Sequence, residues 1–331
     1  MNAHHIDPAT LVDPELRPTL ERALEDFPLQ QDEVTQEDLD ARRKRGAALQ
    51  KAFRPSPSVV ERTLPGGDAG CDVKVFVINA DPAHARPAIL HTHGGGFVAG
   101  SASGCVADLQ VIADTLDCTI VTVEYRLAPE TPFRGSVKDN YTALRWLHAN
   151  AAEIGVDPER IALMGESAGG GHAAILAITA RDRGEVPLCF QALSYPMLDD
   201  RTGSTVQVPG HIGTFIWSAD YNRAGWSAFL GVPAGTADVP VFAVPARVSN
   251  LTGLPSTFIG TGSIDLFVLE NIDYARRLIT AGVPTEMHVV PGGFHGFDGI
   301  VPASSASRRY RLALLNALAR AFGRSELSVP P

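Results

Sequence analysis

A serine stands between two glycines in the segment Gly165-Glu166-Ser167-Ala168-Gly169. The segment follows an apolar run, Ile161 to Met164, which predicts a strand, and it opens a pattern that is typical of a helix. A serine at a strand-to-helix turn needs small neighbours, and the two glycines supply them. The N-terminus of the helix would favour negative charge beside the serine. The pattern alone is weak evidence, but in this context it predicts that Ser167 is a nucleophile.

Three consecutive glycines, Gly94, Gly95 and Gly96, follow an apolar run that ends near His91. Glycines leave the backbone N–H groups open to close approach by a ligand. With the N–H of Ala168, these groups could hold the oxyanion of a tetrahedral intermediate. The alternative interpretation is a flexible turn.

A nucleophilic serine needs a base, and the base needs an acid that orients it. His295 lies in the glycine-rich segment 291–297, directly after a predicted strand, Glu286 to Val290. Asp265 follows another predicted strand, Thr257 to Gly260. Because residues beyond the carboxyl ends of parallel strands line the ligand crevice, we expect both side chains near Ser167.

Other assignments remain open at this point. Asp199 and Asp200 also follow a predicted strand, and Asp298 lies close to the histidine, so each is an alternative for the acid. His91 and His93 would face the same way on a strand and could resemble two metal ligands. Since no third ligand stands nearby, we expect no metal.

The elements that must position these residues alternate between strands and helices. Such alternation predicts a parallel sheet covered on both faces, and the right-handed crossover rule makes it doubly wound. A further pair of strands precedes the alternation, joined by a Gly66-Gly67 turn. The expected strands are 59–63, 71–78, 88–91, 119–123, 161–164, 190–195, 257–260 and 286–290, and the expected helices are 136–150, 167–180, 268–280 and 306–322.

Two parts of the chain lie outside this alternation. The N-terminal part predicts helices over 14–27 and from Thr35 to about Phe53, where Thr35 and Asp38 resemble a capping box. The second helix carries the basic run Arg42-Arg43-Lys44-Arg45, which we interpret as a solvated face. The segment 199–247 has scattered aromatic residues and no such rhythm, so it is expected to be an insertion.

Composition excludes several classes of protein. The 331 residues are 45% hydrophobic and 20% charged, which is ordinary for a globular chain. The net charge of −9 disfavours binding to nucleic acid or to an anionic membrane. Four cysteines without a C-x-x-C pair suit a reducing compartment, and no apolar stretch is long enough for a signal peptide or a membrane span. We therefore expect a cytoplasmic location.

Taken together, the motifs resemble those of the hormone-sensitive-lipase-like serine esterases, which are α/β-hydrolases with a helical cap. The resemblance extends from about Val59 to Phe322. The order serine, acid, histidine along the chain is the one that this fold requires. The motifs that carry the resemblance are His93-Gly94-Gly95-Gly96, Glu124-Tyr125-Arg126-Leu127-Ala128-Pro129-Glu130, the Ser167 turn, Tyr195-Pro196, the Asp265 segment and His295-Gly296-Phe297.

The resemblance implies Ser167 as nucleophile, His295 as base and Asp265 as orienting acid. It also implies an oxyanion hole, usually from the second and third glycines, here Gly95 and Gly96. Further, it implies a catalytic domain over 55–198 and 248–331, and a cap made of the N-terminal helices (1–54) and the insertion 199–247. A homodimer through the sheet edge at 286–290 is a further expectation.

The chain departs from the family pattern in two places. The variable residue before the serine is commonly Asp in this family, and here it is Glu166. The segment after the acid usually reads Pro-Leu-Arg-Asp-Glu, and here it is Leu266-Phe267-Val268-Leu269-Glu270. Only the final glutamate is retained, which affects the expected geometry of the acid loop.

The predicted activity is hydrolysis of soluble short- to medium-chain carboxylic esters through an acyl-enzyme, without a cofactor. The alternatives are an amide, lactone or carbamate hydrolase with the same triad, or a non-catalytic ligand-binding protein on this scaffold. The partner is a small-molecule ester. Its pocket is expected to involve Phe97, Glu166, His211, Phe215 and Trp217.

Overall fold

The computed structural model describes residues 6–26, 34–48, 50–66 and 71–328. Its centre is an eight-stranded sheet with the strand order β1-β2-β4-β3-β5-β6-β7-β8. All pairs from β4 to β8 are parallel, and β2 is antiparallel to both of its neighbours. The predicted doubly wound, mostly parallel sheet is confirmed. The strands are β1 (Val59–Leu64), β2 (Val73–Ile78), β3 (Arg86–Thr92), β4 (Thr119–Glu124), β5 (Val156–Glu166), β6 (Phe190–Ser194), β7 (Ser256–Gly262) and β8 (Thr285–Val290).

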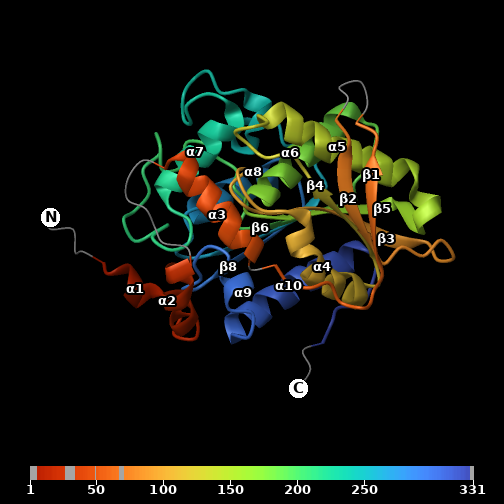
Figure 1. Ribbon diagram of the computed structural model, residues 1–331, viewed down its shortest axis with the longest axis horizontal. Helices are drawn as coiled ribbons and strands as arrows, with labels where there is room; N and C mark the ends of the chain where they lie inside the picture. Colours follow the sequence, from red (N-terminus) through yellow and green to blue (C-terminus); the bar gives the residue numbers. More distant parts are fainter. Residues whose placement is uncertain (1–5, 27–33, 49, 67–70, 329–331) are drawn as a thin grey trace.

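Helices cover both faces of the sheet, with α5 and α6 above it and α4 and α10 below it in Figure 1. Side chains of successive strand residues point to opposite faces of the sheet. Leu90 packs toward α5, α6 and α8, and Ile89 packs toward α4 and α10. The helices are α1 (Pro8–Leu11), α2 (Arg17–Asp26), α3 (Gln36–Ala48), α4 (Ala102–Leu116), α5 (Phe133–Ala149), α6 (Ala168–Arg183), α7 (Ala219–Leu230), α8 (Val268–Thr280), α9 (Phe297–Ile300) and α10 (Ser305–Ala321), with short 3-10 turns at Ala151–Ile154, Val241–Ala243 and Pro245–Arg247.

The N-terminal helix α3 and the helix α7 lie together at one side of the molecule (Figure 1). They share an apolar cluster in which Leu39 of α3 joins Trp217, Trp226 and Phe229. The cluster also includes Ala168, so these two helices pack against the N-terminal end of α6. Segments that are distant in the sequence therefore meet beside the predicted nucleophile.

Several predicted boundaries need correction. The helix expected from Thr35 to Phe53 ends at Ala48, although its capping box is present, with reciprocal bonds of 2.8 and 3.3 Å between Thr35 and Asp38. The helix α4 had no predicted element, and α7 lies in a segment predicted to lack helical rhythm. The C-terminal end of the helix predicted over 14–27 and part of the Gly66-Gly67 turn lie outside the described residues.

Among the described segments, we find no helix whose length and hydrophobicity would suit a bilayer crossing.

Candidate active site

Ser167 occupies the turn between β5 and α6 with a φ of +57°, a conformation that L-residues rarely adopt. Hydrogen bonds on both sides hold it there. Its N–H donates to the carbonyl of Ser194 at 2.9 Å, and its own carbonyl accepts from Gly171 and Met197 at 3.0 Å each. Such a strained residue is typical of functional sites, where the surrounding structure imposes the conformation.

The two glycines beside the serine are required sterically. A Cβ atom at Gly165 would lie 2.4 Å from the carbonyl carbon of Gly169, and one at Gly169 would lie 2.0 Å from the carbonyl oxygen of Thr92. Because both neighbours are backbone atoms, neither could move aside easily. The close approach of α6 to β3 and β5 places Ser167 directly beyond the carboxyl end of β5.

The structure brings the three predicted triad residues into one chain of hydrogen bonds. Nε2 of His295 lies 2.9 Å from Oγ of Ser167, and Nδ1 lies 2.9 Å from Oδ2 of Asp265. The aspartate is fully buried, and the serine and the histidine are 7% and 6% exposed. This arrangement can take a proton from the serine and stabilise the imidazolium that results.

The loops that carry the acid and the histidine are bonded to each other. The N–H of Ile264 donates to the carbonyl of Gly293 at 3.1 Å, and the N–H of Gly292 donates to Oγ of Ser263 at 2.9 Å. A Cβ at Gly262 would lie 2.0 Å from the Gly293 oxygen, so this contact depends on glycine. The two loops therefore form one unit beyond β7 and β8.

Two aromatic rings flank the imidazole. Tyr195 and Phe267 meet the His295 ring edge-on, at centroid distances of 5.1 and 5.2 Å. The Tyr195 hydroxyl donates to Asp298 at 2.9 Å, and burial raises the pKa of this tyrosine well above its usual range. Sequence reasoning did not assign a site role to either ring. For Tyr195 the signal was the motif Tyr195-Pro196, in which the tyrosine is the last residue of the predicted strand 190–195.

The acid loop keeps its link to the sheet despite its altered sequence. Glu270 is buried, and its Oε1 accepts from the N–H groups of Leu198 and Asp199 at 2.7 and 3.3 Å. Burial raises the pKa of this carboxyl well above its usual range. Asn271 adds a 2.7 Å bond to the carbonyl of Pro196. The retained glutamate therefore connects the start of α8 to the segment that follows β6.

The glycine loop, Gly94 to Gly96, runs beside the turn at Ser167. Its second and third glycines have φ values that glycine tolerates best. Gly95 and Gly96 have φ values of +127° and +63°. Among the described residues, no hydrogen bond is recorded for the N–H groups of these glycines or of Ala168. A Cβ at Gly94 would lie 3.4 Å from Cβ of Ser167, so the loop directly adjoins the serine. The loop thus presents open N–H donors next to Ser167.

The segment after β4 holds the glycine loop in place. The Tyr125 hydroxyl donates to the carbonyl of His93 at 2.6 Å, and the N–H of Ala128 donates to the carbonyl of Phe97 at 3.0 Å. The rings of Tyr125 and His93 stack at 4.1 Å, and burial lowers the pKa of His93 to about 3. This histidine is therefore a neutral part of the loop's support.

Glu166, which is predicted to contact substrate, bonds to His91. Its Oε2 lies 2.9 Å from Nε2 of His91, whose Nδ1 lies 2.8 Å from Oγ1 of Thr122. The two histidines that could resemble metal ligands, His91 and His93, thus have separate protein partners. In the described part of the chain, no group of three or more His, Cys, Asp or Glu residues is placed to hold a metal ion.

The other predicted pocket residues differ in their distance from the triad. The Trp217 ring lies 6.4 Å from the His295 ring, between centroids. Phe97 is fully packed, stacked on Phe229 at 4.0 Å. Phe215 packs against the core on the α4 and α10 face. His211 is half-buried, and the described residues include no hydrogen bond to it. Of these four, Trp217 is the one whose ring contact with His295 the structure shows.

The alternative acids are engaged elsewhere. Asp200 forms a bidentate pair with Arg247 at 2.7 and 2.8 Å. Asp199 pairs with Arg201 at 2.8 Å, and Asp298 accepts from Tyr195. Asp265 is the one of the four candidates that contacts the histidine.

The basic run on α3 was interpreted as a solvated face, and for its first two residues this was wrong. Arg43 donates to the carbonyls of Val98 and Ala128 at 2.6 and 2.9 Å, and its side chain is 24% exposed. Arg42 lies over the rings of Trp217 and Tyr221, at 5.1 and 5.0 Å from their centroids. These partners are distant in the sequence, so the local charge pattern contained no signal for them.

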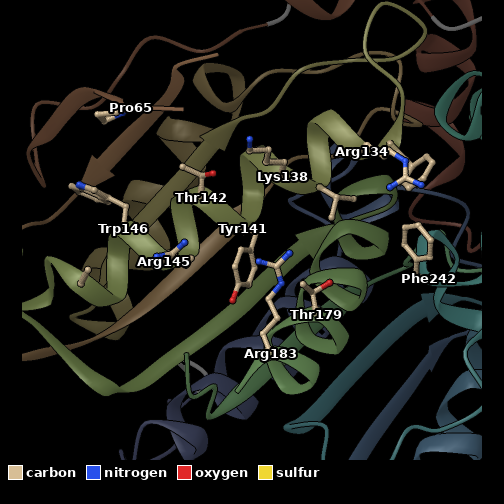
Figure 2. Close-up of a pocket in the computed structure, with 13 residues that line it drawn as sticks. Pro65, Arg134, Lys138, Tyr141, Thr142, Arg145, Trp146, Thr179, Arg183 and Phe242 are labelled. Atoms are coloured by element: carbon tan, nitrogen blue, oxygen red, sulfur yellow. The ribbon is translucent and has the colours of Figure 1, made fainter. Parts of the chain in front are cut away.

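Cavities adjoin the site and also occur away from it. Two cavities, of about 320 and 380 Å³, share Gly94, and the second also includes Glu166 and Tyr195. A larger cavity of about 700 Å³ lies between α5 and the C-terminal end of α6 (Figure 2). There Arg183 stacks on Tyr141 at 4.2 Å, and none of the lining residues belongs to the predicted site. This larger cavity is therefore separate from the three predicted triad residues.

Comparison with known proteins supports the same fold and chemistry. The model of a family described by the alpha/beta hydrolase fold matches residues 89–299. The carboxylesterase NlhH of Mycobacterium tuberculosis is 33% identical over 319 residues, which cover 92% of this chain and 97% of NlhH. An arylesterase of Saccharolobus solfataricus is 31% identical over 64% of this chain and 68% of its own. Among solved structures, a bacterial heroin esterase is similar with a TM-score of 0.85 and 37% identity, covering 96% of this chain and all of that chain (100%).

Proposed function

The chain belongs to the α/β-hydrolase fold family, in its hormone-sensitive-lipase-like group, and from this premise we propose that it is a serine carboxylesterase. In this proposal Ser167 is the nucleophile, His295 the general base and Asp265 the acid that orients it. The observation that carries the proposal is the chain of two 2.9 Å hydrogen bonds from the serine through the histidine to the buried aspartate. It is the geometry that acyl transfer by serine requires.

The reaction proceeds in two balanced steps. Oγ of Ser167 attacks the ester carbonyl carbon while its proton moves to Nε2 of His295, and the C–O bond to the alcohol then breaks as that proton passes to the departing oxygen. Water attacks the acyl-serine ester in the second step, with the same histidine accepting and returning the proton. The products are a carboxylic acid, an alcohol and free enzyme.

The oxyanion of each intermediate is bound by backbone N–H groups in this proposal. Gly95, Gly96 and Ala168 supply the donors, and Gly94 gives the loop its close approach to the serine. Support comes from the open N–H groups in the described residues and from the position of Ala168 as the first residue of α6. Each such donor is typically worth about 3–4 kcal/mol in the transition state.

We also propose that α3 and the insertion 199–247 form a cap over a catalytic domain made of 55–198 and 248–331, with the N-terminal segment 1–54 contributing to the cap. The apolar cluster shared by Leu39, Trp217 and Phe229 supports this division. The substrates are small-molecule esters with short to medium chains. Relatives named as carboxylesterase, arylesterase and heroin esterase support that class.

A cytoplasmic location and a homodimer belong to the proposal as well. The four cysteines are free thiols, as is typical of a reducing compartment. The strand β8 forms one edge of the sheet, and Val289 on it is 40% exposed, which suits pairing of two copies along this edge. Light scattering of the purified protein measures the oligomeric state directly.

The experiment that tests the proposed chemistry is labelling with a fluorophosphonate, followed by mass spectrometry of the peptides. The account expects one covalent phosphonyl group, located on Ser167, and no labelling of the Ser167→Ala variant. Labelling of a different serine, or none in an intact wild-type protein, would show that the nucleophile is misassigned.

A further inference from the structure

The indole of Trp217 fills the space directly above one of the proposed oxyanion glycines. A Cβ atom at Gly96 would lie 2.1 Å from Cη2 and 2.6 Å from Cζ2 of the indole. The Trp217 side chain is buried at 2% exposure, and its ring lies 6.4 Å from that of His295. An ester held between Ser167 and these donors therefore meets the indole edge on one side.

A strained turn sets the direction of this side chain. The N–H of Trp217 donates to the carbonyl of Phe215 at 2.7 Å, and the intervening Ile216 has a φ of +67°. A γ-turn with a positive φ at its centre is rare, and a β-branched residue there is unusual. Ser218 follows at once and caps α7 by accepting from Tyr221 at 3.4 Å. Trp217 is thus fixed between a strained turn and a helix N-terminus.

Arg42 of α3 contacts both the turn and the ring. Its guanidinium carbon lies 5.1 Å from the centroid of Trp217 and 5.0 Å from that of Tyr221, and it donates to the carbonyl of Ile216 at 3.4 Å. A cation over an aromatic face is attracted by the ring electrostatically, and more strongly when it is desolvated. Arg42 therefore contributes to holding the indole in place, together with Asn222, whose Oδ1 accepts from the indole Nε1 at 3.4 Å.

Arg43, the next residue, ties the same helix to the glycine loop. It donates to the carbonyl of Val98 at 2.6 Å and forms a bidentate pair with Glu130 at 2.7 and 2.9 Å. Consecutive arginines on α3 thus reach the two sides of the proposed oxyanion site, the tryptophan on one and the loop on the other. Helix α3 therefore contacts both sides of this site.

We propose that Trp217, held in place by Arg42, sets the upper size limit of the ester group that binds beside Gly96. The inference rests on the proposed esterase function and narrows its substrate class to esters with a short group on that side. Arg42 is a positioning residue, because it acts through the indole. The indole, which is 2% exposed, occupies the space into which a longer group on that side would extend.

The test compares kcat/KM of the wild type and Trp217→Ala in two series. The first varies the acyl group in p-nitrophenyl acetate, butanoate, octanoate and decanoate, and the second varies the alcohol in ethyl, butyl and benzyl acetate. We expect the ratio of long to short substrates to rise at least about tenfold in one series, since each methylene in an apolar pocket is worth roughly 10-fold or more. The series that responds identifies which side of the ester lies at Gly96.

Unchanged ratios in both series would overturn the inference. If the wild type hydrolyses none of these esters, the proposed function fails instead, so the two failures are distinguishable. Trp217→Phe serves as a second variant, because it retains an aromatic ring while shortening its reach. It should shift the same ratio in the same direction by a smaller factor. If both variants fold and neither changes the ratio, the size limit is contradicted.

The role of Arg42 is tested by the same ratio. We expect Arg42→Ala to shift it in the direction of Trp217→Ala but less far, and Arg42→Lys to restore most of the preference because the cation is retained. Lys44→Ala on the exposed face of α3 is the matched control and should keep the wild-type ratio. In the Trp217→Ala background, Arg42→Ala should add no further shift, because positioning residues act through their target. An additive double variant, or a wild-type ratio in Arg42→Ala, would overturn this role.

Discussion

Asp265 divides its two carboxylate oxygens between His295 and the backbone. Oδ2 lies 2.9 Å from Nδ1 of the histidine, and Oδ1 accepts from the N–H of Phe267 at 2.9 Å. Because a buried carboxylate only accepts hydrogen bonds, Nδ1 must carry the proton, and Nε2 is left free to accept one from Ser167. The second bond fixes the rotation of the carboxylate, so the orientation of the imidazole follows from the acid loop.

Asp265→Asn should lower kcat by about 10⁴-fold while leaving the fold intact, because the amide favours the wrong imidazole tautomer. The measurement is kcat on p-nitrophenyl acetate together with near-ultraviolet circular dichroism. Asp199→Asn is the control, since Asp199 pairs with Arg201 and does not contact the histidine. If the control is the variant that loses activity, the assignment of the acid is wrong.

Gly96→Ala should reduce kcat by at least about 100-fold, which corresponds to the loss of one oxyanion donor. The added methyl would lie 2.1 Å from Cη2 of Trp217, and the φ of +63° disfavours any L-residue. Either the indole or the loop N–H must therefore move. Gly210→Ala, where a Cβ has no neighbour within 4 Å, should keep the wild-type kcat. Equal activity in the two variants would contradict the proposed oxyanion site.

Gly165→Ala should destabilise the protein by roughly 2 kcal/mol or more, because the added Cβ would meet backbone atoms of Gly169 at 2.4 Å. Urea denaturation measures the change. Gly46→Ala in α3 is the matched control, since it has no neighbour within 4 Å and should gain about 0.5–1 kcal/mol from helix propensity. A Gly165→Ala protein as stable as the wild type would refute the steric requirement at the serine turn.

The buried histidines predict loss of stability in acid. Burial lowers the pKa of His93 and of His172 to about 3, against an ordinary value of 6.5. Between these values the unfolded chain binds protons that the folded chain excludes. The free energy of unfolding is therefore fully present above pH 6.5 and falls toward pH 3, by up to about 1.4 kcal/mol per pH unit for each histidine.

His172→Phe should flatten this acid slope, because the ring that packs on Phe97 and Phe229 is kept while one titrating group is removed. Urea titrations of the wild type and the variant at several pH values between 3 and 7 measure the slope. The explanation fails if the slope of His172→Phe equals that of the wild type.

Much of the sheet was predictable because its signals are local. The apolar runs at Ala88–His91 and Ile161–Met164 lie within strands β3 and β5, and α8 begins and ends where its pattern predicts. The residues proposed for the triad were also found from short motifs, since each follows a strand at the same sheet edge. Helix α4 was missed because its first turn, with serine and glycine, is typical of a loop.

The rest depends on contacts between distant parts of the chain. The charge run on α3 predicts exposure, yet Arg43 finds carbonyls at Val98 and Ala128 that only the fold brings near. The helix α7 is stabilised by burial of Trp226 and Phe229, and its glycine- and proline-rich surroundings hide the pattern. The contacts that α3 and α7 make beside Ser167 could therefore not be predicted from the sequence.

The most direct test of the account is hydrolysis of p-nitrophenyl acetate by the wild type and Ser167→Ala, measured side by side at the same known enzyme concentration. The account predicts turnover by the wild type and a loss of several orders of magnitude in the folded variant, since the nucleophile of the acyl-enzyme is removed. Near wild-type turnover by Ser167→Ala would contradict it, because the ester would then be cleaved by a group other than the serine that contacts His295.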